Sequence, residues 1–440
     1  MPDIRPLRSA TFRHLATAYW VNEFGNWIGE IALTILVYDR TGSPLATAAL
    51  FLSLRFLPAV LAPLLTARVE VMRPHVVLGT LYVLEGVLFG AIAVLTHHFS
   101  LPAVFVLGAF DGMLAVTAKA LTRSATASGL LADGLLREGN AILNLGMMAA
   151  MACSPVIAGV LVAWKGAAAA LFVDAATFIV TAAVVVTAPN IHVETDTEAG
   201  FVGRLRNGAS VLRNRTAVRR LMIAIAFVMM LSNVPIPIEI VFAKHVLHVG
   251  ASGYGLLLGA WGAGMVVGAA AFAAAGQMRL ITVVAMGTLL CALGYGGLAV
   301  SPTLAVACGC SAVGGLGNGA GWIAAVTAVQ ERIPINTQSA VMAVLEGLNQ
   351  VMPAIGFAVG GAIAAVASPR YAYGVAAVGV AAVVLFAAFR PIDHVQLGQV
   401  DTQDAEESVE AVDFQGDLAS DAQETDTSDR RLPSPNLITG

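Results

Sequence analysis

Charged residues are scarce in this chain. Asp, Glu, Lys and Arg make up 12% of its 440 residues, whereas a soluble domain carries roughly 25%. Hydrophobic residues reach 58%, and the mean hydropathy is +0.79. So little charge cannot cover a water-facing surface, which excludes a soluble globular protein of this length. Because the apolar excess must face lipid, the composition predicts an integral membrane protein.

Motifs of catalysis and of metal or nucleotide binding are also missing. The four cysteines form no CxxC pair and no Cys/His cluster, and the adjacent His97 and His98 lack a third ligand. No Walker lysine, HExxH or nucleophile elbow is present. The glycine-rich run 315–321 has no preceding strand, and its spacing is typical of helix packing. We therefore expect no enzyme activity, no metal, no cofactor and no ATP-driven transport by this chain alone.

Long apolar segments account for most of the chain. A spanning helix needs roughly 20 mostly apolar residues, and turn signals such as Thr41-Gly42-Ser43-Pro44 separate several such segments. Lipid offers no partner for exposed backbone groups, so each segment must be helical. The sequence predicts an all-α membrane protein with twelve transmembrane helices over residues 15–38, 45–66, 75–96, 101–121, 140–163, 167–188, 220–242, 252–275, 280–300, 303–326, 340–366 and 371–390.

The basic residues are distributed unevenly between the two ends of these helices. If the N-terminus is cytoplasmic, sixteen Lys and Arg residues fall in the inner segments. Only four fall in the outer loops, namely Arg40, Lys165, Lys244 and Arg370. Because an excess of Lys and Arg marks cytoplasmic loops, both termini are predicted to be cytoplasmic, in a multi-pass protein of the plasma or inner membrane.

A polar stretch divides the chain in the middle. The predicted order is a cytoplasmic N-terminus (1–14), a six-helix bundle (15–188), a cytoplasmic linker (189–219), a second six-helix bundle (220–391) and an acidic cytoplasmic tail (392–440). Residues 391–440 contain twelve acidic residues against Arg430 and Arg431, a net charge of −10 in a chain whose total is −4. Such a low-hydrophobicity, high-charge tail is predicted to be disordered.

Several short motifs occur in a specific order along the chain. They are Phe24-Gly25-Asn26-Trp27, Val37-Tyr38-Asp39-Arg40-Thr41-Gly42-Ser43-Pro44, Arg55-Phe56-Leu57-Pro58, Leu136-Arg137-Glu138-Gly139-Asn140-Ala141, Gly253-Tyr254-Gly255-Leu256-Leu257 and Gly315-Leu316-Gly317-Asn318-Gly319. Together with the layout of six helices, linker and six helices, they resemble the major facilitator superfamily, and within it the branch of the enterobactin exporter and macrolide-efflux proteins. The resemblance implies a secondary transporter that works by alternating access, with the first, fourth, seventh and tenth helices around a central cavity.

Two signatures of that superfamily are altered here. The Gly-x-x-x-Asp-Arg signature of the loop after the second helix corresponds to Thr66-Ala67-Arg68-Val69-Glu70-Val71-Met72-Arg73. The antiporter-like Gly-Pro-x-x-Gly-Gly pattern of the fifth helix corresponds to Ser154-Pro155-Val156-Ile157-Ala158-Gly159. Pro155 and Gly159 are still predicted to bend this helix, and Pro235 and Pro237 are predicted to break the helix over 220–242.

Charged side chains inside the membrane cost at least ~2.5 kcal/mol each near a helix centre on insertion scales, so each needs a reason. Glu23, Asn26 and Glu30 follow the spacing of one helical face, and Asp111 lies in the fourth helix. The resemblance places both helices at the cavity, where a carboxyl group can take up and release a proton. We therefore predict Asp111, Glu23 and Glu30 as proton-coupling sites. The alternative is that these acids pair structurally with Arg55 or Lys119.

Further polar residues are predicted to line the substrate cavity or a gate. They are Asn26, Arg55, Lys119, Asn233, Glu239, Asn318, Glu346 and Gln350. We expect Arg55 to pair with an acid of the first or fourth helix, with Asp111 as the first choice and Glu23 as the second. Glu85 and Asp174 lie on helices that the resemblance places at the periphery, and are assigned to hydrogen bonds within the bundle.

The leading functional hypothesis is a secondary active transporter. It would couple protons to the efflux of a small amphipathic compound (a drug, siderophore or secondary metabolite), as a monomer in the lipid bilayer with no nucleic-acid partner. One alternative is an importer or facilitator of a small solute. Another is a transporter-like membrane sensor or scaffold that signals through the acidic tail.

Overall fold

The computed structural model describes residues 5–69, 73–131, 134–189, 210, 212–213, 216–274, 278–331 and 335–389. All of them belong to one compact unit, Met1–Phe389. The predicted linker over 189–219 lies mostly outside the described residues, and the predicted tail over 392–440 lies wholly outside them.

In the first half of this unit, the regular elements among the described residues are all helices. Its elements are η1 (Arg5–Arg8), α1 (Ala10–Thr41), α2 (Pro44–Phe51), η2 (Leu52–Phe56), α3 (Leu57–Val69), α4 (Pro74–Leu95), α5 (Leu101–Leu131), α6 (Leu136–Lys165) and α7 (Ala167–Val186). The second span is therefore one continuous helix, α2–η2–α3, with a π-helical turn at η2.

The second half is also helical where it is described. Its elements are α9 (Thr216–Ser232), η3 (Ile236–Ile238), α10 (Glu239–Val241), η4 (Phe242–Val246), α11 (Ala251–Ala274), α12 (Leu280–Val300), α13 (Leu304–Gln330), α14 (Ile335–Val366) and α15 (Pro369–Phe389). The span predicted over 220–242 is thus interrupted after Ser232 and resumes as short turns up to Val246.

Eleven segments of the described chain are long and apolar enough to cross a membrane. The first helix, α1, has 32 residues and is long enough to be one more span, although Glu23, Asn26 and Glu30 lower its hydropathy. The predicted boundaries agree with the structure to within a few residues for most helices. The exception is α5, which continues to Leu131 although its prediction ended at residue 121, so that Arg123 lies inside a helix and not in a loop.

The turn between the first two spans shows how the sequence sets a helix boundary. Gly42 ends α1 with a φ of 60°, a left-handed conformation that glycine adopts without strain. Ser43 then caps α2 by accepting a hydrogen bond from the amide of Ala46, and Pro44 occupies the first turn, where no amide donor is needed. The predicted turn signal is therefore a helix stop followed at once by a helix start.

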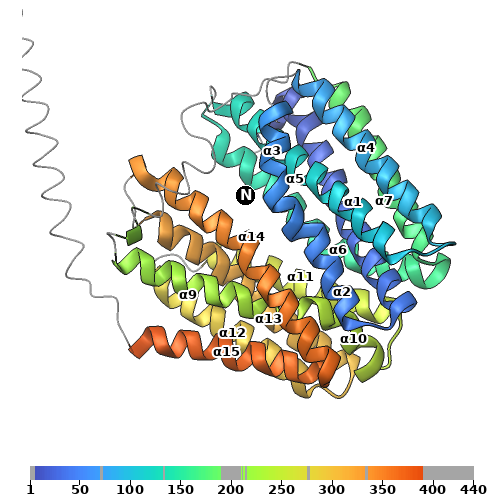
Figure 1. The fold of residues 1–440 in the computed structure, drawn as a ribbon. Helices are drawn as coiled ribbons and strands as arrows, with labels where there is room; N and C mark the ends of the chain where they lie inside the picture. The colour runs from blue at the N-terminus through green and yellow to red at the C-terminus, as the bar shows by residue number, and fades with distance from the viewer. Residues whose placement is uncertain are drawn as a thin grey trace, which may run out of the picture. The chain divides into compact units, whose positions relative to one another are not determined.

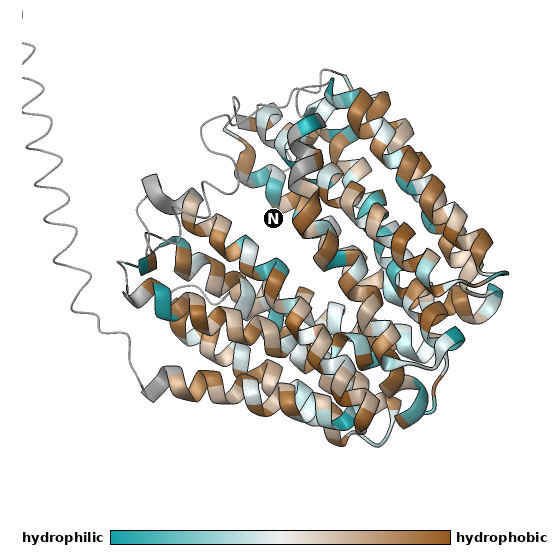
Figure 2. Cartoon of the chain, in the orientation of Figure 1, coloured by the Kyte–Doolittle hydropathy of each residue, from teal (hydrophilic) through white to brown (hydrophobic). Residues whose placement is uncertain are grey.

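Hydrophobic residues are distributed along all the helices (Figure 2), and many of their large apolar side chains are exposed. On α7, Phe172, Ile179 and Val186 are all exposed and recur every seven residues, which keeps them on one face. Water would penalise such a surface at roughly 25 cal/mol per Å², whereas lipid does not. The exposed apolar faces are those of a membrane protein.

Each half packs mainly on itself, and the halves meet mainly along two helix pairs (Figure 1). Within the first half α1 packs on α6 and α7, and within the second half α13 packs on α11 and α12. A Cβ built on Gly315 would lie 2.0 Å from the carbonyl oxygen of Trp261, so the glycine-rich run lets α13 contact the backbone of α11. Between the halves, α6 packs on α11 and α14 packs on α2.

Candidate functional site

α1 presents two acids to cations from neighbouring helices of the same half. Lys119 of α5 donates to Glu23, with an Nζ–Oε1 distance of 2.7 Å. Arg55 of η2 donates through Nη2 to both carboxylate oxygens of Glu30, at 2.6 and 2.7 Å. Seven residues separate the two acids, which is about 10 Å along a helix that rises 1.5 Å per residue. Two ion pairs therefore lie one after the other along one face of α1.

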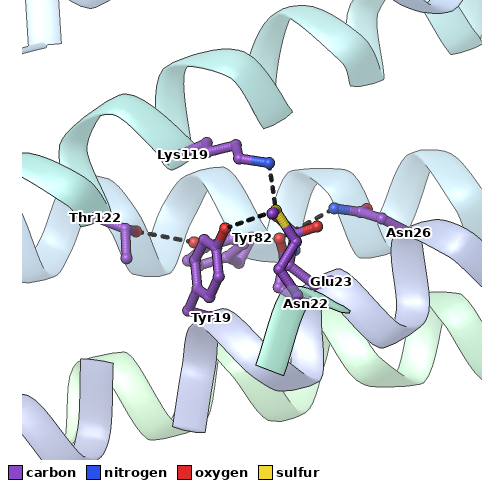
Figure 3. Close-up of polar contacts among 8 residues, drawn as sticks. Tyr19, Asn22, Glu23, Asn26, Tyr82, Lys119 and Thr122 are labelled. Carbon is purple, nitrogen blue, oxygen red and sulfur yellow. Dashed lines mark hydrogen bonds and ion pairs between the residues drawn. The ribbon is translucent and has the colours of Figure 1, made fainter. Parts of the chain in front are cut away.

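Figure 3 shows the Glu23–Lys119 pair, whose two side chains differ in exposure. The side chain of Glu23 is 7% exposed and that of Lys119 is 42% exposed. The ammonium also lies 5.8 Å from the centre of the Tyr19 ring, a distance at which the ring face attracts a cation. The carboxylate of Glu23 is therefore buried among the helices, whereas the side chain of Lys119 is partly exposed.

The polar groups around this pair are bonded to each other (Figure 3). Asn26 on the same helix donates to Asn22, at 3.0 Å. The hydroxyls of Tyr82 and Thr122 lie 3.0 Å apart and join α4 to α5. The first contact lies within α1, and the second joins α5, which carries Lys119, to α4.

The second pair depends on a local irregularity of the backbone. Arg55 lies in the π-helical turn η2, a type of turn that is frequent at functional sites. Its pairing agrees with the prediction in the helix but differs in the residue. Asp111, the expected partner, is not bonded to Arg55, and the second choice, Glu23, pairs with Lys119 instead. The observed partner is Glu30 of α1, so an acid of the first helix is confirmed and both named choices were wrong. The two ion pairs are those of the alternative in which these acids pair with Arg55 or Lys119.

Three further acids are buried in the first half, and none of the ion pairs among the described residues includes them. Glu85, Asp111 and Asp174 are at most 5% exposed. In the described part of the chain, both oxygens of Glu85, Oδ1 of Asp111 and Oδ2 of Asp174 lack a hydrogen-bond partner. Asp174 accepts a 3.3 Å hydrogen bond from Thr177 of its own helix, as expected of it. For Glu85 the predicted hydrogen bond within the bundle is wrong.

A cavity of about 470 Å³ lies between the two halves. From the first half it is lined by Tyr19, Arg123, Asn140, Leu143 and Asn144. From the second half its lining includes Trp322, Val326, Gln330, Glu346 and Asn349. Tyr19 both lines the cavity and faces Lys119. A residue of the cavity wall therefore contacts the cation of the first ion pair.

At the far end of α1 a third acid joins the two halves. Asp39 forms an ion pair with Lys244, which lies in the π-helical turn η4 of the second half. Beside it, the rings of Tyr38 and His245 meet edge to face with centroids 5.9 Å apart. In the sequence, Asp39 belongs to a motif and Lys244 to a predicted outer loop. Their contact was not predicted, because nothing in the sequence spacing shows that these two residues meet.

Comparison with known families decides the class of protein. The family described as transmembrane secretion effector matches residues 2–415. The chain belongs to this family. No protein with a curated description matches the sequence. The family and the fold are those of membrane transporters rather than enzymes.

Solved structures share the fold at low sequence identity. The nucleoside transporter NupG superposes with a TM-score of 0.71 at 14% identity, covering 87% of this chain and 98% of that chain. A bacterial homologue of the iron transporter ferroportin in its inward-facing state gives 0.65 at 15% identity, over 85% and 97%. A bacterial homologue of the human lysosomal transporter Spinster gives 0.62 at 12% identity, over 86% and 95%. The predicted major facilitator fold and the multi-pass membrane location are confirmed, while the efflux branch stays a prediction.

The remaining predicted site residues divide between the cavity and other places. Glu346 lines the cavity and accepts a 3.0 Å hydrogen bond from Gln350 one turn further along α14. Asn233, Glu239 and Asn318 are not among the residues that line this cavity. Asn233 instead donates to the carbonyl of Met229 at 2.7 Å and caps the end of α9; Glu239 and Asn318 are half-buried.

The prolines have different local effects. Pro235 and Pro237 lie where α9 stops and short turns replace it, and the hydroxyl of Tyr295 donates to the freed carbonyl of Ser232 at 2.8 Å. Pro155, by contrast, lies inside the continuous helix α6. Together with Gly159 it forms the surface against which α11 packs.

Proposed function

We propose that this chain exports a small amphipathic compound in exchange for protons, by alternating access between its two halves. The description of its family as secretion effectors supports export. The cavity of about 470 Å³ between the halves has the size of a small-molecule site. Proton coupling rests on the Glu23–Lys119 pair, a buried acid whose cation extends toward the cavity wall.

Protonation and deprotonation of Glu23 provide a way for a proton to drive the transport cycle. When Glu23 takes up a proton, it no longer attracts Lys119, and the ammonium becomes free to move toward the cavity. When the proton leaves, the ion pair forms again. Glu30 and Arg55 repeat this arrangement further along α1, and Asp111, with an unbonded carboxyl oxygen, is the additional site for a proton.

The predicted topology assigns a side to each end. With both termini in the cytoplasm, the Asp39–Lys244 pair would close the outer end of the path, and the cavity bordered by Arg123 and Glu346 would open toward the inner end. An exporter in this state accepts its substrate from the cytoplasm.

The first experiment identifies the compound. A deletion strain and an overexpressing strain are compared against a panel of antibiotics and secondary metabolites. A compound tolerated less by the deletion strain and more by the overexpressing strain supports export. If overexpression instead raises cellular accumulation, the chain is an importer or facilitator.

The second experiment tests the coupling residue with that compound. In inverted vesicles, Glu23→Gln should abolish uptake driven by an imposed pH gradient, because the amide keeps the size of the acid but cannot exchange a proton. Glu331→Gln, an exposed acid after the end of α13, is the matched control and should transport normally. Well-folded Glu23→Gln protein with an unchanged pH dependence would remove Glu23 as the coupling site, and Asp111→Asn would then be tested in the same way.

A further inference from the structure

The cavity between the halves carries one charge of each sign, on opposite sides. Arg123 of α5 is its cation and Glu346 of α14 is its anion, and no other described residue of the lining is charged. Within the described residues neither side chain forms an ion pair, and Glu346 accepts only the amide hydrogen bond of Gln350. Both side chains are exposed. Two opposite charges thus border one cavity without neutralising each other.

The rest of the lining combines amides with apolar and aromatic surface. Asn140 and Asn144 lie one turn apart on α6, and Asn349 lies one turn after Glu346 on α14. Amide side chains donate and accept hydrogen bonds, so they suit polar groups of either kind. Between them, Leu143 and Val326 are apolar, and Tyr19 and Trp322 supply aromatic rings from opposite halves.

We propose that this cavity binds a small amphipathic zwitterion, with its anionic group at Arg123 and its cationic group at Glu346. The inference rests on the proposed transport function and narrows its substrate class. A guanidinium recognises a carboxylate through two parallel hydrogen bonds, and Glu346 provides the matching acceptor for an ammonium group. The apolar part of the ligand lies between the rings of Tyr19 and Trp322.

Only a ligand with both charges satisfies both halves at once. A purely anionic ligand contacts Arg123 but leaves the carboxylate of Glu346 without a cation. A purely cationic ligand contacts Glu346 but leaves Arg123 without an anion. A zwitterion bridges α5 and α14, so its binding energy favours a state in which the two halves are closer together. The same contacts therefore select the substrate and favour the conformational change.

Binding by purified full-length protein in detergent tests this without any gradient. The probes are three pools of dipeptides made from alanine, leucine and phenylalanine: unblocked, N-acetylated and C-amidated. Quenching or enhancement of tryptophan fluorescence and a rise in melting temperature report binding, and Trp322→Phe shows which part of the signal arises in the cavity. We expect the unblocked pool to bind about tenfold more tightly than either blocked pool, because each blocked pool loses one charge-assisted contact.

Charge-specific variants make the test independent of overall folding. The Arg123→Gln variant should bind unblocked and amidated dipeptides equally, because it lacks the guanidinium that recognises the C-terminal carboxylate. Glu346→Gln should bind unblocked and acetylated dipeptides equally. Arg220→Gln and Glu331→Gln change exposed charges that are not part of the lining and should keep the discrimination of the unmodified protein.

Three results would overturn the inference: no binding of any pool, equal binding of all three pools, or variants that weaken all pools by the same factor. Its failure is distinct from that of the proposed function. If the strain comparison identifies an exported compound that lacks one of the two charges, export stands and the zwitterion site does not. If zwitterions bind selectively but neither strain differs from its parent in tolerance, the binding site stands and export does not.

Discussion

Asp39 at the end of α1 forms an ion pair with Lys244 of η4, and this contact ties the first half of the chain to the second. The side chains are 48% and 23% exposed, respectively, so solvent screens the pair and its removal should change stability by no more than about 1 kcal/mol. Its effect on the balance between transport states should be larger, because it bridges the two moving parts.

The first prediction follows from this bridge. Lys244→Gln should loosen that end of the molecule, so that a cysteine introduced at Tyr38 reacts faster with a membrane-impermeant maleimide than in the unmodified chain. Exchanging the charges, with Asp39→Lys and Lys244→Asp together, should restore slow labelling. If the exchanged pair labels as fast as the single variant, the ion pair does not hold the two halves together.

The second prediction concerns the backbone contact between α6 and α11. A Cβ built on Gly255 would lie 2.3 Å from the carbonyl oxygen of Pro155, and backbone cannot rotate out of the way as a side chain can. Gly255→Ala should therefore destabilise the protein by about 1–3 kcal/mol, seen as a lower melting temperature in detergent. Gly90→Ala in α4, where a Cβ meets nothing within 4 Å, is the control and should be neutral or slightly stabilising.

The third prediction tests the observed partner of Arg55. Arg55→Ala removes the cation that Glu30 contacts, so adding Glu30→Gln should recover part of the lost melting temperature. A coupling free energy of about 1 kcal/mol is expected for this pair. The combination of Arg55→Ala with Asp111→Asn should instead be additive. If the losses of melting temperature are additive in both combinations, the Arg55–Glu30 contact does not persist in the purified protein.

The fourth prediction concerns the break between α9 and η3. Tyr295→Phe removes the hydroxyl that donates to the part-buried carbonyl of Ser232, and leaving such an acceptor unsatisfied should cost about 1 kcal/mol, the lower end for a buried group. The melting temperature should fall accordingly. Tyr371→Phe is the control, because that side chain is 67% exposed. Equal melting temperatures for the two variants would show that water or another donor satisfies the carbonyl.

The sequence by itself determined the positions of the membrane helices. The prediction over 280–300, for example, coincides with α12. A spanning segment is recognised from its own length and apolarity, which depend on no other part of the chain. The prediction ended α5 too early at residue 121, because Arg123 follows there, whereas the helix continues past this cavity residue to Leu131. Local composition does not distinguish such a helix from a loop.

Only the tertiary structure decided which charges meet. The spacing of Glu23 and Glu30 places both acids on one face of α1, as expected, but it does not show which helix lies opposite that face. The partner of Arg55 was wrong for this reason, and the contact between Asp39 and Lys244, 205 residues apart, was not predicted. The rotation, tilt and neighbour of each helix follow from packing over the whole chain, and these relations decide the distances between charges.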